Sequence, residues 1–248
     1  MAHSTAHSDA VDTIGRGIVQ GVHAPGSVMK LEDLQHEYGI SRTVAREVMR
    51  VLESMNLIES RRRVGLIVQD PAAWPVFDPR VVRWRLAGED RETQLRWMTE
   101  LRVAVEPWAA NLAASATASV GAELMRTAHQ MRVYGEAGDL ETFLELDRAY
   151  HDLLLRGSGN QLFAALSEVI GEVLAGRTHL GLMPHQPVAE ALQLHEDVAR
   201  AVLERDPLAA MHGMSDLLAE VRTALFVTTP ESAPSATASA AHGTRASL

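Results

Sequence analysis

A helix that runs directly into a short hairpin, over residues 41–69, is the feature that most restricts the fold of this chain. Apolar residues recur three and four positions apart in its first part, as on the buried face of a helix: Val44, Val48, Val51, Leu52 and Met55. Ser41 is a suitable N-cap, and Asn56 can adopt the left-handed backbone conformation that ends a helix. Two short β-prone runs follow, 57–59 and 66–69, on either side of a basic turn. This order of elements predicts a small helical domain that ends in a hairpin.

Two more helices are predicted before this segment. Residues 9–22 carry apolar residues at helical spacing, and residues 31–38 form a short helix before Gly39. Three helices followed by a small hairpin form the winged helix-turn-helix pattern, in which the second and third helices are the DNA-reading unit. We expect this domain to cover residues 9–70, after a flexible N-terminus at residues 1–8.

The polar side of the predicted third helix carries three arginines four residues apart, and the hairpin turn carries three more. Residues 40–65 hold these six arginines against three acidic residues, although the whole chain has a formal net charge of −9. Arginine near the start of a recognition helix can bind guanine or phosphate, and a basic wing can reach phosphates or the minor groove. The predicted DNA-binding residues are Arg42, Thr43, Arg46, Arg50, Arg61, Arg62, Arg63 and Gly65. The alternative interpretation is a solvated arginine face that pairs with Glu47 and Glu53.

From residue 81 to about residue 228 the sequence predicts an all-α antiparallel bundle, so the protein as a whole is expected to be mainly α. Ala and Leu are abundant and aromatic residues make up only 4% of the chain, which favours helices. Residues 71–80 contain three prolines and are predicted to be a linker. The expected helices cover 78–86, 90–117, 119–136, 139–156, 160–182, 187–204 and 207–227. The Ser-, Ala- and Pro-rich residues 229–248 are predicted to be disordered.

The composition also restricts the compartment and the kinds of site. The chain has no cysteine, which excludes disulfides and thiolate metal sites and fits a reducing cytosol. The N-terminus lacks the apolar core of a signal peptide, and no run of about 18 apolar residues is present that could cross a membrane. We therefore expect a cytoplasmic protein with no membrane partner.

The stretch ISRTVAREVMRVLESMNLIESRRRVGLIV, residues 40–68, resembles the DNA-binding domain of GntR-family regulators. The motif of that family reads S-R-T-x-V-R-E-A-L-x-x-L-E-x-x-G-L-I, followed by a basic wing that ends in glycine. The chain departs from it at Ala45, Val48 and Asn56, and none of these departures removes an arginine. The resemblance implies a homodimer that binds a pseudo-palindromic operator in double-stranded DNA.

Three stretches of the helical part resemble the FadR-type effector domain, called FCD. They are ELRVAVEPWAANLAA, DRAYHDLLLRGSGN and LHEDVARAVLERDPLAAM, at residues 100–114, 147–160 and 194–211. Together with DPRVVRWRL, they are similar to the sugar-acid branch of this subfamily, which includes galactonate-responsive repressors. The resemblance implies a regulator that binds a small carboxylate effector in its helical domain and thereby changes its affinity for the operator.

Asp147 and His151 lie four residues apart and so project from one face of a predicted helix. A carboxylate and an imidazole can begin a site for a divalent metal, although a surface pair is the commoner explanation of this spacing. The resemblance implies that these residues and His195 are ligands of a divalent cation such as Zn, Ni or Mn. The family's usual fourth ligand is a histidine, and Leu217 occupies that position here. The effector or water could complete the site, or the same residues could bind the effector without metal.

Two arginines of the helical part are candidate effector contacts. Arg102 lies four residues before Glu106, and its position in the family favours contact with the carboxylate of the effector, because guanidinium and carboxylate pair through two hydrogen bonds. The alternative is an intrahelical salt bridge with Glu106. Arg177 is a second candidate, and its alternative role is to complement the dipole at a helix C-terminus.

The sequence thus predicts a ligand-responsive transcription regulator, a repressor of a sugar-acid or related carboxylate operon, rather than an enzyme. A metal-dependent enzyme built on Asp147, His151 and His195 would lack an evident general base or nucleophile near them. Two further alternatives stay open. One is a metal-free sensor of an acyl ligand, with a large apolar pocket, and the other is a constitutive DNA-binding dimer with a purely structural helical domain.

Overall fold

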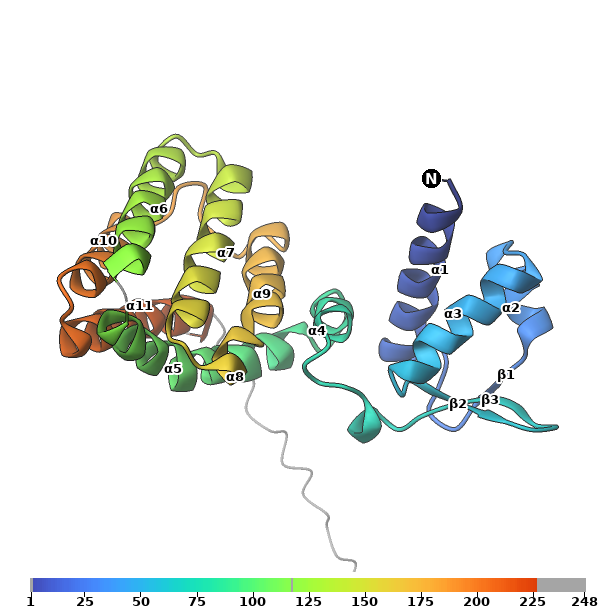
Figure 1. Ribbon diagram of the computed structural model, residues 1–248. Helices are drawn as coiled ribbons and strands as arrows, with labels where there is room; N and C mark the ends of the chain where they lie inside the picture. Colours follow the sequence, from blue (N-terminus) through green and yellow to red (C-terminus); the bar gives the residue numbers. More distant parts are fainter. Residues whose placement is uncertain (1, 117, 227–248) are drawn as a thin grey trace, which may run out of the picture.

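The computed structural model describes residues 2–116 and 118–226, which form two domains joined through one short helix (Figure 1). The N-terminal domain contains α1 (Ala2–Val19), β1 (Val28–Met29), α2 (Leu31–Tyr38), α3 (Arg42–Ser54), β2 (Ile58–Arg61) and β3 (Gly65–Val68). The connection contains a 3-10 turn, η1 (Pro71–Ala73), and the joining helix α4 (Pro79–Leu86). The C-terminal domain contains α5 (Arg91–Ser115), α6 (Ala118–Glu136), α7 (Leu140–Gly157), α8 (Gln161–Ala164), α9 (Ser167–His179), α10 (Ala189–Leu203) and α11 (Pro207–Phe226). The predicted fold class, a winged helix-turn-helix followed by a helical bundle, is confirmed.

The wing of the N-terminal domain is the hairpin of β2 and β3, to which β1 adds a third strand. The strands pair antiparallel in the order β1–β3–β2, with Val28 opposite Ile67 and Arg61 opposite Gly65. β1 was not predicted, because two residues are too short to produce the alternating pattern that marks a strand. Gly65 has φ = 125°, and a Cβ there would lie 2.9 Å from Val28 Cγ1. Glycine is therefore required where the wing returns past β1.

The two ends of α3 follow the prediction, whereas α1 does not. The Ser41 side chain accepts a hydrogen bond from the α3 backbone at 3.3 Å, and Asn56 has φ = 55° just after the helix. α1 begins at Ala2 and ends at Val19, whereas the sequence indicated a helix over 9–22 after a flexible N-terminus. The first residues of the chain are polar or small, so apolar periodicity gives no sign of the helix there.

The connection at residues 71–80 is ordered in the structure. η1 and α4 each begin with a proline, and the aspartate before each proline accepts a hydrogen bond from the backbone of the new turn. Trp84 of α4 is buried, and its Nε1 donates to Asp12 Oδ1 of α1 at 3.1 Å. The same helix packs against α9 and α5 of the helical domain. α4 therefore contacts both domains.

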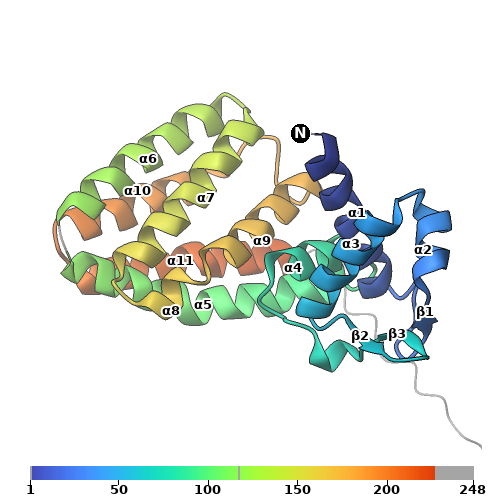
Figure 2. The same cartoon turned by 45° about the vertical axis from the view of Figure 1, so that its right-hand side comes forward.

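The largest buried cluster among the described residues of the helical domain is shared by five helices. α5 and α11 run antiparallel, since Asn111 near the end of α5 donates to the carbonyl of Pro207 at the start of α11 at 3.0 Å (Figure 2). α6, α7 and α10 pack with them around buried residues that include Met131, Tyr150, Leu154, Leu192, Val198 and Leu218. α9 packs on α7 and on α4. This arrangement places inward-facing residues of α7 and α10 around a common point.

The sequence predicted one helix over 160–182, and that prediction is wrong, because the segment forms α8 and α9. The chain turns at Leu166, whose N–H bonds to Phe163 O in a tighter turn and whose carbonyl accepts from Ile170 of α9. Phe163 and Leu166 both pack against the same buried cluster. Apolar spacing alone does not reveal a break of this kind, since both sides of the break remain apolar toward the core.

The predicted disordered tail, residues 229–248, lies outside the described residues, which end at residue 226. None of the helices in the described ranges is both long enough and apolar enough to cross a membrane.

Gly121→Ala is expected to destabilise the helical domain, because α6 and α10 approach closely at this glycine. An added Cβ would lie 2.5 Å from Leu203 Cα, and backbone cannot turn aside as a flexible side chain can. Overpacking costs about 1–3 kcal/mol, whereas alanine in place of an unobstructed helical glycine stabilises by about 1 kcal/mol. Urea unfolding followed by circular dichroism measures the change. Gly17→Ala, whose Cβ would meet nothing nearer than 3.4 Å, is the control, and equal effects of the two variants would contradict the explanation.

Candidate functional site

The predicted DNA-binding residues lie on α3 and on the wing. On α3, Arg42, Thr43, Arg46 and Arg50 are exposed, as are Glu47, Glu53 and Ser54, and the wing exposes Arg61, Arg62 and Arg63. Ala45, Val48 and Leu52, on the opposite side of α3, are buried. Within the described ranges, Arg42, Arg46, Arg62 and Arg63 form no ion pair. These cationic groups are therefore available to an external anion.

The pairing of this arginine face with acidic residues is only partly present. Arg50 Nη1 lies 2.6 Å from Glu47 Oε1, but Glu53 accepts a hydrogen bond from the backbone of β2 instead of pairing with an arginine. Arg61 pairs with Glu59 at 3.0 Å. Exposed pairs of this kind contribute little free energy, so these arginines can exchange their partner for a phosphate.

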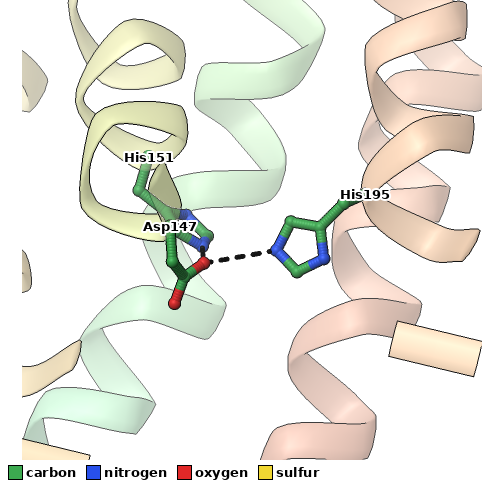
Figure 3. Close-up of side chains that lie close together, drawn as sticks. All are labelled: Asp147, His151 and His195. Carbon is green, nitrogen blue, oxygen red and sulfur yellow. Dashed lines mark ion pairs between the residues drawn. The ribbon is translucent and has the colours of Figure 1, made fainter. Parts of the chain in front are cut away.

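Asp147 and His151 project from α7 toward His195 of α10 (Figure 3). Asp147 Oδ1 lies 3.4 Å from the Nε2 atom of each histidine, and candidate ligand atoms of all three residues lie within 4.8 Å of one another. All three residues are buried, so Asp147 and His151 are not a surface pair. The fold brings together the three candidate metal ligands that the sequence indicated.

A buried ion pair on α5 holds the ring of His151. Arg102 Nε donates to Glu106 Oε1 at 2.6 Å, and Arg102 Nη2 lies 3.1 Å from His151 Nε2. Glu106 Oε2 lies 2.8 Å from His151 Nδ1, an ion-pair distance at which the ring N–H is not aligned for a hydrogen bond. The intrahelical salt bridge expected as the alternative role of Arg102 therefore exists. The pair is fully buried and orients a histidine. An exposed salt bridge, in contrast, contributes little free energy and would not orient a candidate ligand.

Two residues that orient the histidines were not predicted as members of the site. Glu106 contacts His151 as described, and the Tyr150 hydroxyl donates to the His195 carbonyl at 2.8 Å. The Tyr150 ring also packs edge-on against both histidine rings. For Glu106, the sequence offered one signal, which is the charged pair of Arg102 and Glu106 between apolar neighbours on one helix. Tyr150 gives no signal in the sequence beyond its place beside His151.

Hydrogen-bond partners determine which ring nitrogens carry protons. His195 Nδ1 lies 2.7 Å from the Ala191 carbonyl, which can only accept, so the neutral ring has its proton on Nδ1 and a lone pair on Nε2. Among the described residues, this Nε2 is buried without a hydrogen-bond partner. Arg102 can only donate, so the neutral His151 ring has its lone pair on Nε2, where it accepts from Arg102. Three electron-pair donors therefore converge on one buried point, which fits a divalent cation.

The pKa shifts keep both carboxyl groups of this buried group ionised at neutral pH. Burial would raise the pKa of Asp147, but its contacts with His151 and His195 outweigh burial and hold the pKa well below the usual range. Burial would also raise the pKa of Glu106, and the charges of Arg102 and His151 lower it to about 2. Burial lowers the pKa of His151, and Glu106 raises it, with a net increase. Arg102 already balances Glu106, so the ionised Asp147 is the charge that a bound cation would neutralise, in competition with protons for the same lone pairs.

A cavity of about 70 Å³ lies beside the three residues. Leu217 contributes apolar atoms to its wall and is buried, so no histidine faces the cavity from that position. Part of the segment 182–188, between α9 and α10, forms another side of the cavity. The volume has room for a few water molecules, which is less than a sugar acid occupies.

Arg177 and Glu220 face this cavity from α9 and α11. Arg177 Nη2 donates to Met183 Sδ at 3.3 Å, and its Nε is buried without a partner among the described residues. Burial, together with repulsion from Arg102, lowers the pKa of Arg177 to about 10. Arg177 also lies in the last turn of α9, so its alternative role at the helix dipole remains valid. In the part of the chain that the structure describes, Glu220 has no hydrogen-bond or ion-pair partner, and burial raises its pKa.

Two family models match successive parts of the chain. Residues 7–68 match the model described as bacterial regulatory proteins, gntR family, and residues 98–220 match the model described as FCD domain. The first match contains α3 and the wing. The second contains the buried group around Asp147, His151 and His195.

Two curated proteins and one solved structure are similar to the chain over most of its length. The galactonate operon transcriptional repressor of Escherichia coli (strain K12) is 32% identical over 214 residues, which cover 84% of this chain and 92% of that protein. The probable D-xylose utilization operon transcriptional repressor of Paenarthrobacter nicotinovorans is 25% identical and covers 87% of this chain and 86% of its own. The structure of E. coli McbR/YncC shares the fold with a TM-score of 0.51 at 17% identity, over 90% of this chain and 97% of that chain.

Proposed function

The chain belongs to the GntR family of bacterial regulatory proteins and carries an FCD domain, and from this premise we propose that it is a repressor that a hydroxylated carboxylic acid releases from its operator. Family membership makes it a DNA-binding transcription regulator rather than an enzyme. The observation that carries the choice of ligand is the convergence of Asp147, His151 and His195 on a cavity that Arg177 also faces. We assign DNA binding to residues 9–70, and effector binding and dimerisation to residues 81–228.

The operator contacts that we propose come from α3 and the wing. α3 would enter the major groove with Arg42, Thr43 and Arg46, which lie in its N-terminal half. Arg50 and the wing arginines would bind phosphates and fix the orientation of the domain. A homodimer would place two such helices about one turn of DNA apart, on the two halves of a pseudo-palindromic operator.

In the helical domain, Asp147, His151 and His195 would hold a divalent cation such as Zn, Ni or Mn. Leu217 adds no ligand, so the remaining positions would be left to water or to the effector. A cation here supplies positive charge that a carboxylate can bind. When His151 Nε2 gives its lone pair to a cation, Arg102 Nη2 loses that acceptor and becomes available to the effector. Without metal, Asp147, His151 and His195 would bind the acid through hydrogen bonds, which is the alternative form of this proposal.

The lining of the cavity favours a hydroxylated acid over an alkyl acyl ligand. Arg177 offers an unused donor for a carboxylate, and Glu220 offers an unused acceptor for hydroxyl groups. An acyl-chain sensor would need a large apolar pocket, whereas this cavity is small and has charged residues on several sides. The similarity to a galactonate operon repressor supports the same class of ligand. Because the cavity is smaller than a sugar acid, we expect the segment 182–188 to move when the ligand enters.

Ligand binding could reach the DNA-binding domain through α9 and α4. α9 carries Arg177 at the cavity, and Gly176 packs so closely on Leu86 of α4 that a Cβ would lie 2.8 Å from Leu86 Cδ1. Arg83 of α4 also pairs with Glu172 of α9 at 2.8 Å. α4 then contacts α1 through the buried Trp84. A shift of α9 would thus change the position of the winged domain, which is a coupling between two sites through packed elements.

A thermal-shift screen of sugar acids and short hydroxy acids, with and without a chelator, tests this function. A ligand that binds only the folded state stabilises it by about 2.7 kcal/mol at a hundredfold excess over Kd. The acid that shifts the melting temperature should also lower affinity for an operator fragment obtained by selection from random DNA. No stabilisation by any acid, or stabilisation with unchanged operator affinity, would count against an effector-controlled repressor. A melting shift that persists in the presence of the chelator would support the acid as effector and would show that its binding needs no metal.

Glu220→Leu is expected to weaken binding of the hydroxylated acid about tenfold or more, because a hydroxyl then loses its acceptor in a buried site. The matched acid without the hydroxyl should bind the variant as well as it binds the parent. Isothermal titration calorimetry of both acids measures the difference. Glu204→Leu is the control, since Glu204 is exposed and does not line the cavity. Equal losses for the two acids would show that Glu220 does not recognise the hydroxyl.

A further inference from the structure

A second cavity, of about 430 Å³, lies between the DNA-binding domain and the helical domain. It is separate from the cavity at Asp147, and α4, which is drawn between the two domains in Figure 2, forms part of its wall. The side chains that matter for its chemistry are Ile18, Trp74, Arg85, Gln94 and Trp97. The volume falls within the range of about 300–1,000 Å³ that is typical of small-molecule sites.

Arg85 gives this cavity a cation without a counter-ion. Its guanidinium lies 5.7 Å from the centre of the Trp74 ring, and among the described residues it forms no ion pair or hydrogen bond. Arg85 is partly buried, and burial lowers its pKa although Asp90 acts in the opposite direction. A half-buried arginine with unused donors matches the carboxylate of a ligand, which it can bind through two hydrogen bonds.

Gln94 gives the cavity an unused polar group that is almost fully buried. The residue is only 4% exposed, and its Oε1 has no hydrogen-bond partner within the described part of the chain. A buried amide oxygen without a partner costs stability, so its persistence calls for an explanation. Gln94 lies in the first turns of α5, where the N-cap residue Asp90 provides no side-chain cap. The uncapped N–H groups of that turn also favour a carboxylate.

Aromatic rings and acidic residues narrow the class of ligand further. The buried Trp74 and the half-exposed Trp97 both line the cavity, and indole faces stack with planar rings. Glu89 and Asp90 are exposed at its edge and repel each negative charge of a ligand, and Arg85 can offset one such charge.

We propose that this interdomain cavity is a second ligand site, for a small aromatic monocarboxylic acid that carries a hydrogen-bond donor. Its carboxylate would bind Arg85 and the start of α5, its donor would reach Gln94 Oε1, and its ring would pack against Trp97. Such a ligand would touch α1 and α5 at once and would fix the two domains relative to each other. The proposal depends neither on the metal nor on the acid assigned to the first cavity.

Titration calorimetry of the full-length chain with 4-hydroxyphenylacetate tests the site. We expect saturable binding of one molecule per chain, with a change in tryptophan fluorescence. Phenylacetate, which lacks the hydroxyl, should bind more weakly by about tenfold, and tyramine, which lacks the carboxylate, should not bind. Arg85→Gln should weaken 4-hydroxyphenylacetate about tenfold or more. Arg126→Gln is the matched control, because Arg126 is an exposed arginine on α6 that does not line this cavity.

Gln94→Leu provides a test that does not depend on Arg85. It should weaken 4-hydroxyphenylacetate to the level of phenylacetate and leave phenylacetate unchanged. No saturable binding at millimolar ligand would overturn the proposal. Equal effects of Arg85→Gln and Arg126→Gln would overturn it as well. So would binding that Arg177→Gln removes and Arg85→Gln does not, since the acid would then occupy the first cavity.

Discussion

Arg46→Ala is expected to abolish specific operator binding while the fold and the proposed dimer stay intact. Arg46 is exposed one turn after Arg42 on α3 and has no ion pair within the described residues. Loss of one bidentate contact to guanine costs about 1–3 kcal/mol, and a homodimer loses the contact in both half-sites, so affinity should fall by about 100-fold or more. Fluorescence anisotropy with an operator fragment and an unrelated duplex, at matched salt, measures the loss.

Arg126→Ala is the matched control for this experiment. Arg126 is an exposed arginine on α6 that pairs with Glu123 at 3.3 Å, so its removal changes the net charge equally without touching α3. Operator affinity of this variant should equal that of the parent, and both variants should melt and elute as the parent does. If Arg46→Ala binds the operator as tightly as Arg126→Ala does, α3 does not read the DNA in the way proposed.

The winged domain could be predicted from the sequence where one side of an element faces water. α3 is the clearest example, because its apolar residues Ala45, Val48 and Leu52 are buried while its arginines are exposed. α1 and the α8–α9 break were not predicted correctly, because the start of α1 lacks apolar spacing and the break lies within a continuously apolar region. β1 owes its existence to pairing with β3, which is a tertiary contact.

The buried group in the helical domain shows a different limit. The spacing of Asp147 and His151 places them on one helical face, but nothing in the spacing brings His195 of another helix to them. That expectation came from the resemblance to the FCD domain, which the family comparison supports. The protonation of the ring nitrogens depends on contacts with Ala191 and Arg102, which are tertiary contacts that the sequence does not reveal. The second cavity gave no sequence signal, since its residues come from segments that are far apart in the chain.

Asp147→Asn is expected to remove bound metal and the response to the acid together. The amide keeps the size of the side chain but removes the charge that both histidines approach at 3.4 Å. Loss of a residue that only orients a metal ligand lowers metal affinity by about 10–100-fold. Loss of the proposed ligand Asp147 itself should lower it by more. The carboxylate should also stabilise the fold by itself. Because its pKa lies below the unfolded value of 3.8, that contribution is present at neutral pH and is lost only as strong acid protonates the folded state.

Asp152→Asn is the matched control on the same helix, where Asp152 pairs with the exposed Arg156 at 2.7 Å. It should leave metal content and ligand response unchanged. Metal content after dialysis, measured by plasma mass spectrometry, and the melting shift caused by the acid separate the remaining forms of the proposal. If the parent holds no metal and Asp147→Asn still abolishes the shift, the residues bind the acid directly. If Asp147→Asn keeps both metal and shift, the convergence of Asp147, His151 and His195 is structural, and the effector must bind elsewhere.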